Sequence, residues 1–139
     1  MWEIKWSKWS YIFLEVINIK FKGYKKNIIG NEKKSIIESI KRKYVNAENE
    51  RKLIWNSFIE KPQCYSFEKI FCIGIPNTEN LYFFLERQDE LYITTLQNIF
   101  NFVHAFEPWE EIDAYIFDKT MLWIVAITHE DNLLLTVGI

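Results

Sequence analysis

Apolar and polar residues alternate in blocks over the last quarter of the chain, from Glu107 to Ile139. Three short apolar runs, 114–117, 122–128 and 133–137, are rich in β-branched and aromatic residues, as strands are. The polar segments between them are only a few residues long, which is too short for a crossover helix. The pattern therefore predicts a meander of three antiparallel strands.

The preceding segment shows the same strand signals and then changes to a helical period. The run LYFFLE at 81–86 predicts a strand, and the polar residues 87–90 predict a reversal into a second strand at 91–94. Thr95 can cap a helix that ends at Pro108. Its apolar stripe consists of Leu96, Ile99, Phe100, Val103 and Phe106.

Helical periodicity dominates residues 31–61. Asn31 is a plausible N-cap with Lys34 at the third helical position, before an apolar stripe of Ile36, Ile37, Ile40 and Tyr44. A second stripe follows Glu48 and Glu50 and ends at Pro62; its members are Ile54, Trp55, Phe58 and Ile59. We expect two helices with a break near Val45 and Asn46, although one long helix is the alternative.

Two segments give weaker signals. Residues 1–21 fit both a helical and an alternating period, and we expect a helix over the first two turns that becomes extended by Ile17. Gly23 and Gly30 suit chain reversals, and residues 66–75 read as an edge or linker strand. Together the elements predict one α+β domain spanning 1–139. Its helices pack on one face of a mainly antiparallel sheet, with the strands at 81–86 and 121–128 near the centre.

Composition indicates a folded protein that has more aromatic residues than its core needs. Of 139 residues, 49% are hydrophobic and 17% aromatic, which excludes a disordered chain. So many rings exceed ordinary core needs, and we expect some at the surface, where Trp and Tyr commonly anchor interfaces.

Charge is unevenly distributed along the chain. Residues 1–61 contain 14 Lys or Arg and 7 Asp or Glu, whereas residues 107–139 contain 1 and 7. Such asymmetry concerns the electrostatic field and the partners of a protein and not its fold. Nine basic residues at 20–43 would suit an anionic surface. A soluble helix face is the simpler explanation, because the chain is net acidic and lacks a nucleic-acid-binding motif.

Several chemistries are disfavoured by the sequence. The four glycines, at 23, 30, 74 and 138, never reach the spacing of a phosphate-binding loop, and no serine lies in a G-x-S-x-G setting. The two cysteines and two histidines lack the paired spacing of metal ligands, so we expect no metal and no cofactor. Cys64 and Cys72 are expected to be reduced and buried in a cytoplasmic protein that has no signal peptide and no membrane span.

The polar segment that begins at His129 is the most suggestive chemically. His129, Glu130 and Asp131 share one tight turn, with Asp118 and the cluster of Glu110, Glu111 and Asp113 close in sequence. They indicate a negative patch that would favour a protonated histidine. The alternative is a solvated hairpin turn, in which Asp and Asn occur because they tolerate turn geometry.

The C-terminal third resembles a group of small bacterial proteins, some of which act as immunity proteins in polymorphic or contact-dependent toxin systems. The likeness lies in the phrase AYIFDKTMLWIVAITHEDNLLLTVG, with Trp55 and the LYFFLE strand as further points. It rests on Tyr115-Ile116, Asp118-Lys119, Trp123, His129, Asp131 and Gly138. Members often carry a histidine where Glu130 stands, a departure that weakens a catalytic or metal-binding role for this turn. The resemblance implies binding rather than chemistry.

We therefore expect a cytoplasmic, non-enzymatic immunity protein that occludes a cognate toxin with an acidic, aromatic surface, without binding nucleic acid. The candidate contact residues are Trp109, Glu110, Glu111, Asp113, Asp118, His129, Glu130 and Asp131. Two alternatives remain open: an enzyme that uses His129 and a neighbouring carboxylate as acid and base, and a homodimeric scaffold subunit.

Overall fold

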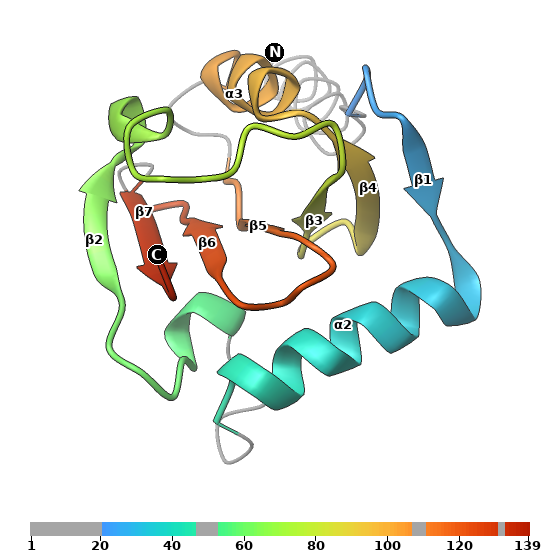
Figure 1. Cartoon of the computed structure of the whole chain (residues 1–139), viewed down its shortest axis with the longest axis horizontal. Helices are drawn as coiled ribbons and strands as arrows, with labels where there is room; N and C mark the ends of the chain where they lie inside the picture. Colours follow the sequence, from blue (N-terminus) through green and yellow to red (C-terminus); the bar gives the residue numbers. More distant parts are fainter. Residues whose placement is uncertain (1–20, 47–52, 107–110, 131–132) are drawn as a thin grey trace, which may run out of the picture.

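The computed structural model describes residues 21–46, 53–106, 111–130 and 133–139. In this part of the chain, seven strands form one antiparallel sheet in the order β1-β4-β3-β5-β6-β7-β2 (Figure 1). The strands are β1 (Lys26–Ile28), β2 (Gln63–Ser66), β3 (Leu81–Leu85), β4 (Glu90–Thr94), β5 (Ala114–Phe117), β6 (Ile124–Ile127) and β7 (Leu133–Val137). The predicted α+β class and the C-terminal meander are confirmed.

The two α-helices of the described residues lie on opposite faces of the sheet, α3 (Leu96–His104) on one and α2 (Gly30–Tyr44) on the other (Figure 1). The predicted placement of the helices on a single face is wrong. The central strands explain the difference, because they are apolar on both sides. In β5, Ala114 and Ile116 pack in the core beneath α3, whereas Tyr115 and Phe117 pack in the core beneath α2. A strand without polar alternation needs cover on both faces.

Strand β5 lies at the middle of the sheet, between β3 and β6. As predicted, the strands within 81–86 and 121–128 are central. Leu85 pairs with Ala114, and Ala114 pairs with Ile127. Because neighbouring strands are antiparallel, the end of β3, the start of β5 and the end of β6 lie side by side at the same end of the sheet. This convergence positions the site described below.

Both helices occur where the sequence predicts them, but only one has the expected cap. The Thr95 hydroxyl accepts a hydrogen bond from the Asn98 amide at 3.2 Å and caps α3. For α2 the predicted cap at Asn31 is wrong, because the N-cap position falls on Ile29, whose side chain makes no capping bond. The helix ends at Tyr44 and the chain is extended at Val45, which confirms the predicted break.

The predicted second helix is wrong over its described part. Residues 53–61 contain only the short 3-10 helix η2 (Ile54–Asn56). Tertiary partners take the place of helical ones: the Ile54 amide donates to the Glu86 carboxylate, and the Trp55 amide donates to the Tyr115 hydroxyl. Phe58 then pairs with Val45 in an isolated β-bridge.

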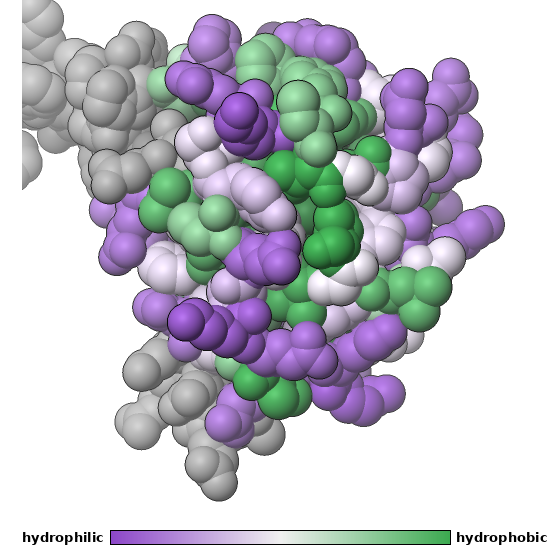
Figure 2. All heavy atoms as spheres, turned by 60° about the vertical axis from the view of Figure 1, so that its left-hand side comes forward, coloured by the Kyte–Doolittle hydropathy of each residue, from purple (hydrophilic) through white to green (hydrophobic). Residues whose placement is uncertain are grey.

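The strand expected at 66–75 begins and ends earlier. Pairing with β7 selects Gln63–Ser66, and the 3-10 helix η3 (Phe67–Lys69) follows at once. Cys64 and Cys72 are free, as expected, but both are exposed and not buried. Cys64 lies on β2, which is an edge strand of the sheet. On the side of the molecule that carries β2, apolar residues form an uneven band bordered by hydrophilic ones (Figure 2).

The predictions for residues 1–20 and 47–52 lie outside the described residues. The described chain starts at Phe21, which is buried against the rings of Phe83, Tyr92 and Phe102. In the part of the chain that the structure describes, no helix combines the length and apolar character needed to cross a membrane.

Candidate functional site: a buried carboxylate and its donors

Asp113, immediately before β5, is the centre of a polar cluster at the end of the sheet where β3 and β6 finish and β5 begins. Its side chain is fully buried, with 0% exposure. Oδ1 accepts hydrogen bonds from the indole Nε1 of Trp55 and from Nδ1 of His129, both at 2.8 Å. Oδ2 accepts from Nε of Arg87 at 2.5 Å. The carboxylate thus binds three side chains that are far apart in the sequence.

The sheet topology explains this convergence. Arg87 follows β3, Asp113 precedes β5 and His129 follows β6, so the antiparallel pairings bring all three to the same end of the sheet. The main chain reinforces the contact, because the Glu86 amide donates to the Asp113 carbonyl at 2.9 Å. Trp55 reaches the cluster from η2, and its ring lies edge-on to His129 at 5.7 Å.

A second carboxylate, Glu86, extends the cluster inward. It accepts from the buried Tyr115 hydroxyl at 2.5 Å and from the Ile54 amide at 3.1 Å. The Tyr115 hydroxyl in turn accepts from the Trp55 amide at 3.1 Å. Trp55 therefore bonds to Asp113 through its ring and to Tyr115 through its main chain, which fixes η2 against the end of the sheet.

The surroundings shift the pKa values of the two carboxyl groups in opposite directions. Burial alone would raise the pKa of Asp113, but hydrogen bonds from His129, Arg87 and Trp55 outweigh it and lower the pKa below its ordinary value. For Glu86, burial dominates and raises the pKa, although bonds from Tyr115 and the Ile54 amide oppose this effect. Burial and the adjacent Glu86 also raise the pKa of the Tyr115 hydroxyl.

An ionised Asp113 determines the tautomer of His129. A carboxylate only accepts hydrogen bonds, so Nδ1 of His129 must carry the proton that lies between them. In the neutral ring, its Nε2 atom then carries the lone pair. The His129 side chain is 25% exposed, and that of Arg87 is 40% exposed. The cluster can therefore present an oriented imidazole and a fixed guanidinium to a bound molecule.

The structure brings some of the predicted site residues together and separates others. Glu111 joins the cluster through a 3.0 Å ion pair with Arg87, and Glu130 is exposed beside His129. Asp113 is buried and paired, so it is not part of an exposed negative patch. Asp118 lies at the opposite end of β5, where it accepts hydrogen bonds from Thr120 and Trp123. Trp109, Glu110 and Asp131 lie outside the described residues.

Three members of the cluster were missed at the sequence level: Trp55, Glu86 and Arg87. The available signal was the polar pair Glu86-Arg87 directly after an apolar strand. Its significance depends on the pairing of β3 with β5, which are separated in sequence by β4 and α3. Trp55 was read as an apolar residue of a helical stripe, whereas its indole N–H is what the site uses.

Among the described residues, no group of three or more His, Cys, Asp or Glu side chains is arranged to hold a metal ion. Comparison of the chain with protein-family models, with curated proteins and with solved structures gives no match. The geometry of the cluster is therefore the basis for the functional proposal.

Proposed function

We propose that the protein binds another protein through the surface at the Asp113 end of the sheet, and that this partner is a bacterial toxin domain that it neutralises. The observation that carries the proposal is the fixation of Trp55 and Arg87 by one buried carboxylate. Trp and Arg are enriched among the residues that dominate binding energy at protein interfaces. Side chains that are already ordered lose less conformational entropy when a partner binds.

The charges of this surface favour a partner of mixed or positive charge. Glu111 and Glu130 are exposed there, and Arg87 lies between Asp113 and Glu111. Toxins that act on nucleic acid usually have a basic cleft, which exposed carboxylates can approach with electrostatic steering. The resemblance of the C-terminal third to immunity proteins supports the same kind of partner.

Cell protection tests this proposal. The protein encoded by the adjacent reading frame is produced in a susceptible cell together with the wild type, Arg87→Gln or the control Lys22→Gln, which changes an exposed cation elsewhere. We expect protection by the wild type and by the control, and loss of protection with Arg87→Gln at equal protein levels. Full protection by Arg87→Gln, or none by the wild type, would contradict the proposal.

A second candidate function is acid–base catalysis by His129, which its 2.8 Å contact with Asp113 favours. The two functions predict different results for His129→Gln. A binding protein forms a stable complex with its partner and keeps much of its affinity in this variant. An enzyme loses its effect on the partner entirely. Size-exclusion chromatography of the mixture, repeated with His129→Gln, separates the two.

A further inference from the structure

A second exposed surface lies at the other end of β5, where the turn 118–123 meets the C-terminal end of α2. Two of the most exposed large hydrophobic side chains are found here, Leu122 at 68% and Ile59 at 62%. Tyr44 connects them: its hydroxyl donates to the Met121 carbonyl at 2.6 Å, and its carbonyl accepts from the Ile59 amide at 2.9 Å. The segments that carry the two apolar side chains are therefore both bonded to Tyr44.

The turn that presents Leu122 is held in a defined shape. Met121 has a positive φ of 54°, which is uncommon for a residue with a side chain. Its carbonyl oxygen accepts from Lys43 Nζ at 2.5 Å as well as from Tyr44. Asp118 accepts from the Thr120 amide and from the indole of Trp123. An exposed leucine on a turn with so many hydrogen bonds is ready to bind without further ordering.

A small cavity lies beside these residues. It measures about 100 Å³ and is lined by Lys43, Tyr44, Ile59, Glu60 and Val137. Pockets for drug-sized ligands measure about 300–1,000 Å³, so this cavity accommodates a single side chain and not a cofactor. Its walls are mainly apolar, which suits an aliphatic side chain.

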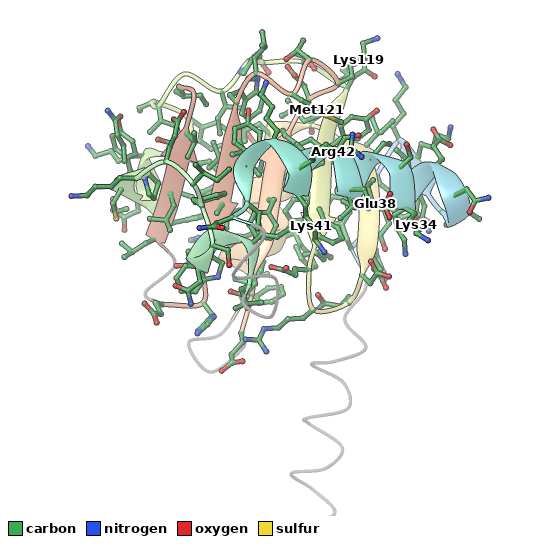
Figure 3. The ribbon with its side chains drawn as sticks, turned by 90° about the horizontal axis from the view of Figure 1, so that it is seen from below. Lys34, Glu38, Lys41, Arg42, Lys119 and Met121 are labelled. Atoms are coloured by element: carbon green, nitrogen blue, oxygen red, sulfur yellow. The ribbon has the colours of Figure 1, made fainter. Side chains whose placement is uncertain are left out.

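The surroundings of the cavity contain both cations and carboxylates. Figure 3 looks onto α2, with Arg42 on the helix and Lys119 in the turn near Met121, whereas Lys34 lies towards the other end of the helix. Lys43 donates to a neutral carbonyl, so its charge is not neutralised there. The nearby carboxylates are Glu60, which lines the cavity, and Asp118, whose hydrogen bonds to the Thr120 amide and the Trp123 indole also leave its charge in place. The three cations Arg42, Lys43 and Lys119 therefore outnumber the two carboxylates, Glu60 and Asp118, by one.

We propose that this surface binds an acidic polypeptide segment that inserts one aliphatic side chain between Tyr44, Ile59 and Val137. Charge complementarity with Arg42, Lys43 and Lys119 selects the acidic flanks, and the cavity selects the anchor. An anionic membrane fits less well, because a lipid surface needs no pocket for one side chain. The site is distinct from the Asp113 cluster, which lies at the opposite end of β5.

Selection from a random peptide display library on the immobilised full chain tests the proposal. We expect enriched peptides that combine Asp or Glu with a large aliphatic residue. Their affinity should fall about tenfold or more with Leu122→Ser, Ile59→Ser or Lys119→Glu, as for interface anchors. The matched control is Ile29→Ser, because Ile29 is 71% exposed at the other end of α2. Thermal midpoints of all variants show whether they remain folded.

The proposal is overturned by an absence of enriched peptides, by enriched peptides without acidic residues, or by equal affinity in the folded variants and the control. Two parallel measurements address other occupants. Co-sedimentation with phosphatidylserine vesicles that is abolished by Lys119→Glu would assign the surface to a membrane. A concentration-dependent mass that is abolished by Leu122→Ser would assign it to a second copy of the chain.

Discussion

Asp113 is the residue on which the described end of the sheet depends most. A buried carboxylate is stable only when its acceptor positions are filled, and here Trp55, Arg87 and His129 fill them. An Asn side chain keeps one acceptor oxygen but puts an NH2 donor in place of the other, so it leaves donors at that position unpaired and the Arg87 guanidinium without its counter-charge. We therefore expect the polar cluster, and not only the apolar core, to control the stability of this region.

The substitution Asp113→Asn tests that expectation. Hydrogen bonds to charged groups contribute about 1.5–3 kcal/mol each, so we expect a loss of at least this size in the free energy of unfolding at neutral pH. Because folding lowers the pKa of Asp113, its contribution is present above the unfolded pKa of about 3.9 and is lost as the pH falls through the folded pKa. Urea unfolding at neutral and acidic pH should show a smaller acid-induced loss for Asp113→Asn than for the wild type. Equal pH profiles of Asp113→Asn and the wild type would show that Asp113 does not provide this stability. The control is Asp89→Asn, which changes an exposed carboxylate.

Glu86 should behave in the opposite way. Folding raises its pKa, so its contribution is favourable below the unfolded pKa of about 4.3 and diminishes as the pH rises through the folded pKa. Glu86→Gln keeps an oxygen that can accept from Tyr115 and Ile54. The stability of Glu86→Gln relative to the wild type should therefore increase from acidic to neutral pH in chemical unfolding. A relative stability that decreases over this range would contradict the burial argument.

At the scale of the elements, the close approach of β7 to the turn before β6 requires Gly138. Its φ is +85°, and an added Cβ would overlap the carbonyl oxygen of Leu122. Gly30 provides a matched control, because its φ is +63° and nothing lies within 4 Å of its added Cβ. We expect Gly30→Ala to cost about 1–2 kcal/mol from backbone strain alone. Gly138→Ala should cost about 1–3 kcal/mol more because of overpacking. Similar unfolding midpoints for the two variants would refute the predicted contact.

The elements also show how far the sequence predicts the fold. The strands at 81–85, 90–94 and 114–137, and the helices α2 and α3, follow from local periodicity and turn residues. The segment around Trp55 does not, because its amides and ring bond to Tyr115, Glu86 and Asp113, which are far away in sequence. Periodicity records which side chains are apolar, but it does not record which distant acceptor competes for a backbone amide. The unbroken apolar strands indicate helices on both faces of the sheet. The prediction of a single face did not take this pattern into account.

The candidate site was predictable to a smaller extent than the fold. Glu111, Asp113 and His129 were singled out because they lie in or beside the C-terminal meander, where sequence neighbours are also spatial neighbours. Arg87 and Trp55 are brought to them by the β3–β5 pairing and by η2, which are non-local features. Asp118 was grouped with them by sequence distance, although one antiparallel strand separates its end of the sheet from theirs.

For the whole molecule, the structure separates two surfaces at the two ends of β5. One contains the cluster around Asp113, with Trp55, Arg87 and exposed carboxylates, and the other contains Leu122 and Ile59 among cations. A chain with opposite charge in its two halves thus carries two chemically different faces. We propose toxin binding at the first surface, where charge changes should alter association without unfolding the protein.

Association kinetics test this central claim most directly. The double variant Glu111→Lys with Glu130→Lys reverses two exposed charges at the Asp113 end, and Glu38→Lys with Glu79→Lys makes the same change elsewhere on the surface. Binding of the protein encoded by the adjacent reading frame is measured at low and high salt, together with thermal midpoints. We predict a slower association and a reduced salt dependence for the first variant only, at unchanged midpoints. Association rates that are equal for both variants and the wild type at low salt would contradict the assignment of the binding surface to the Asp113 end.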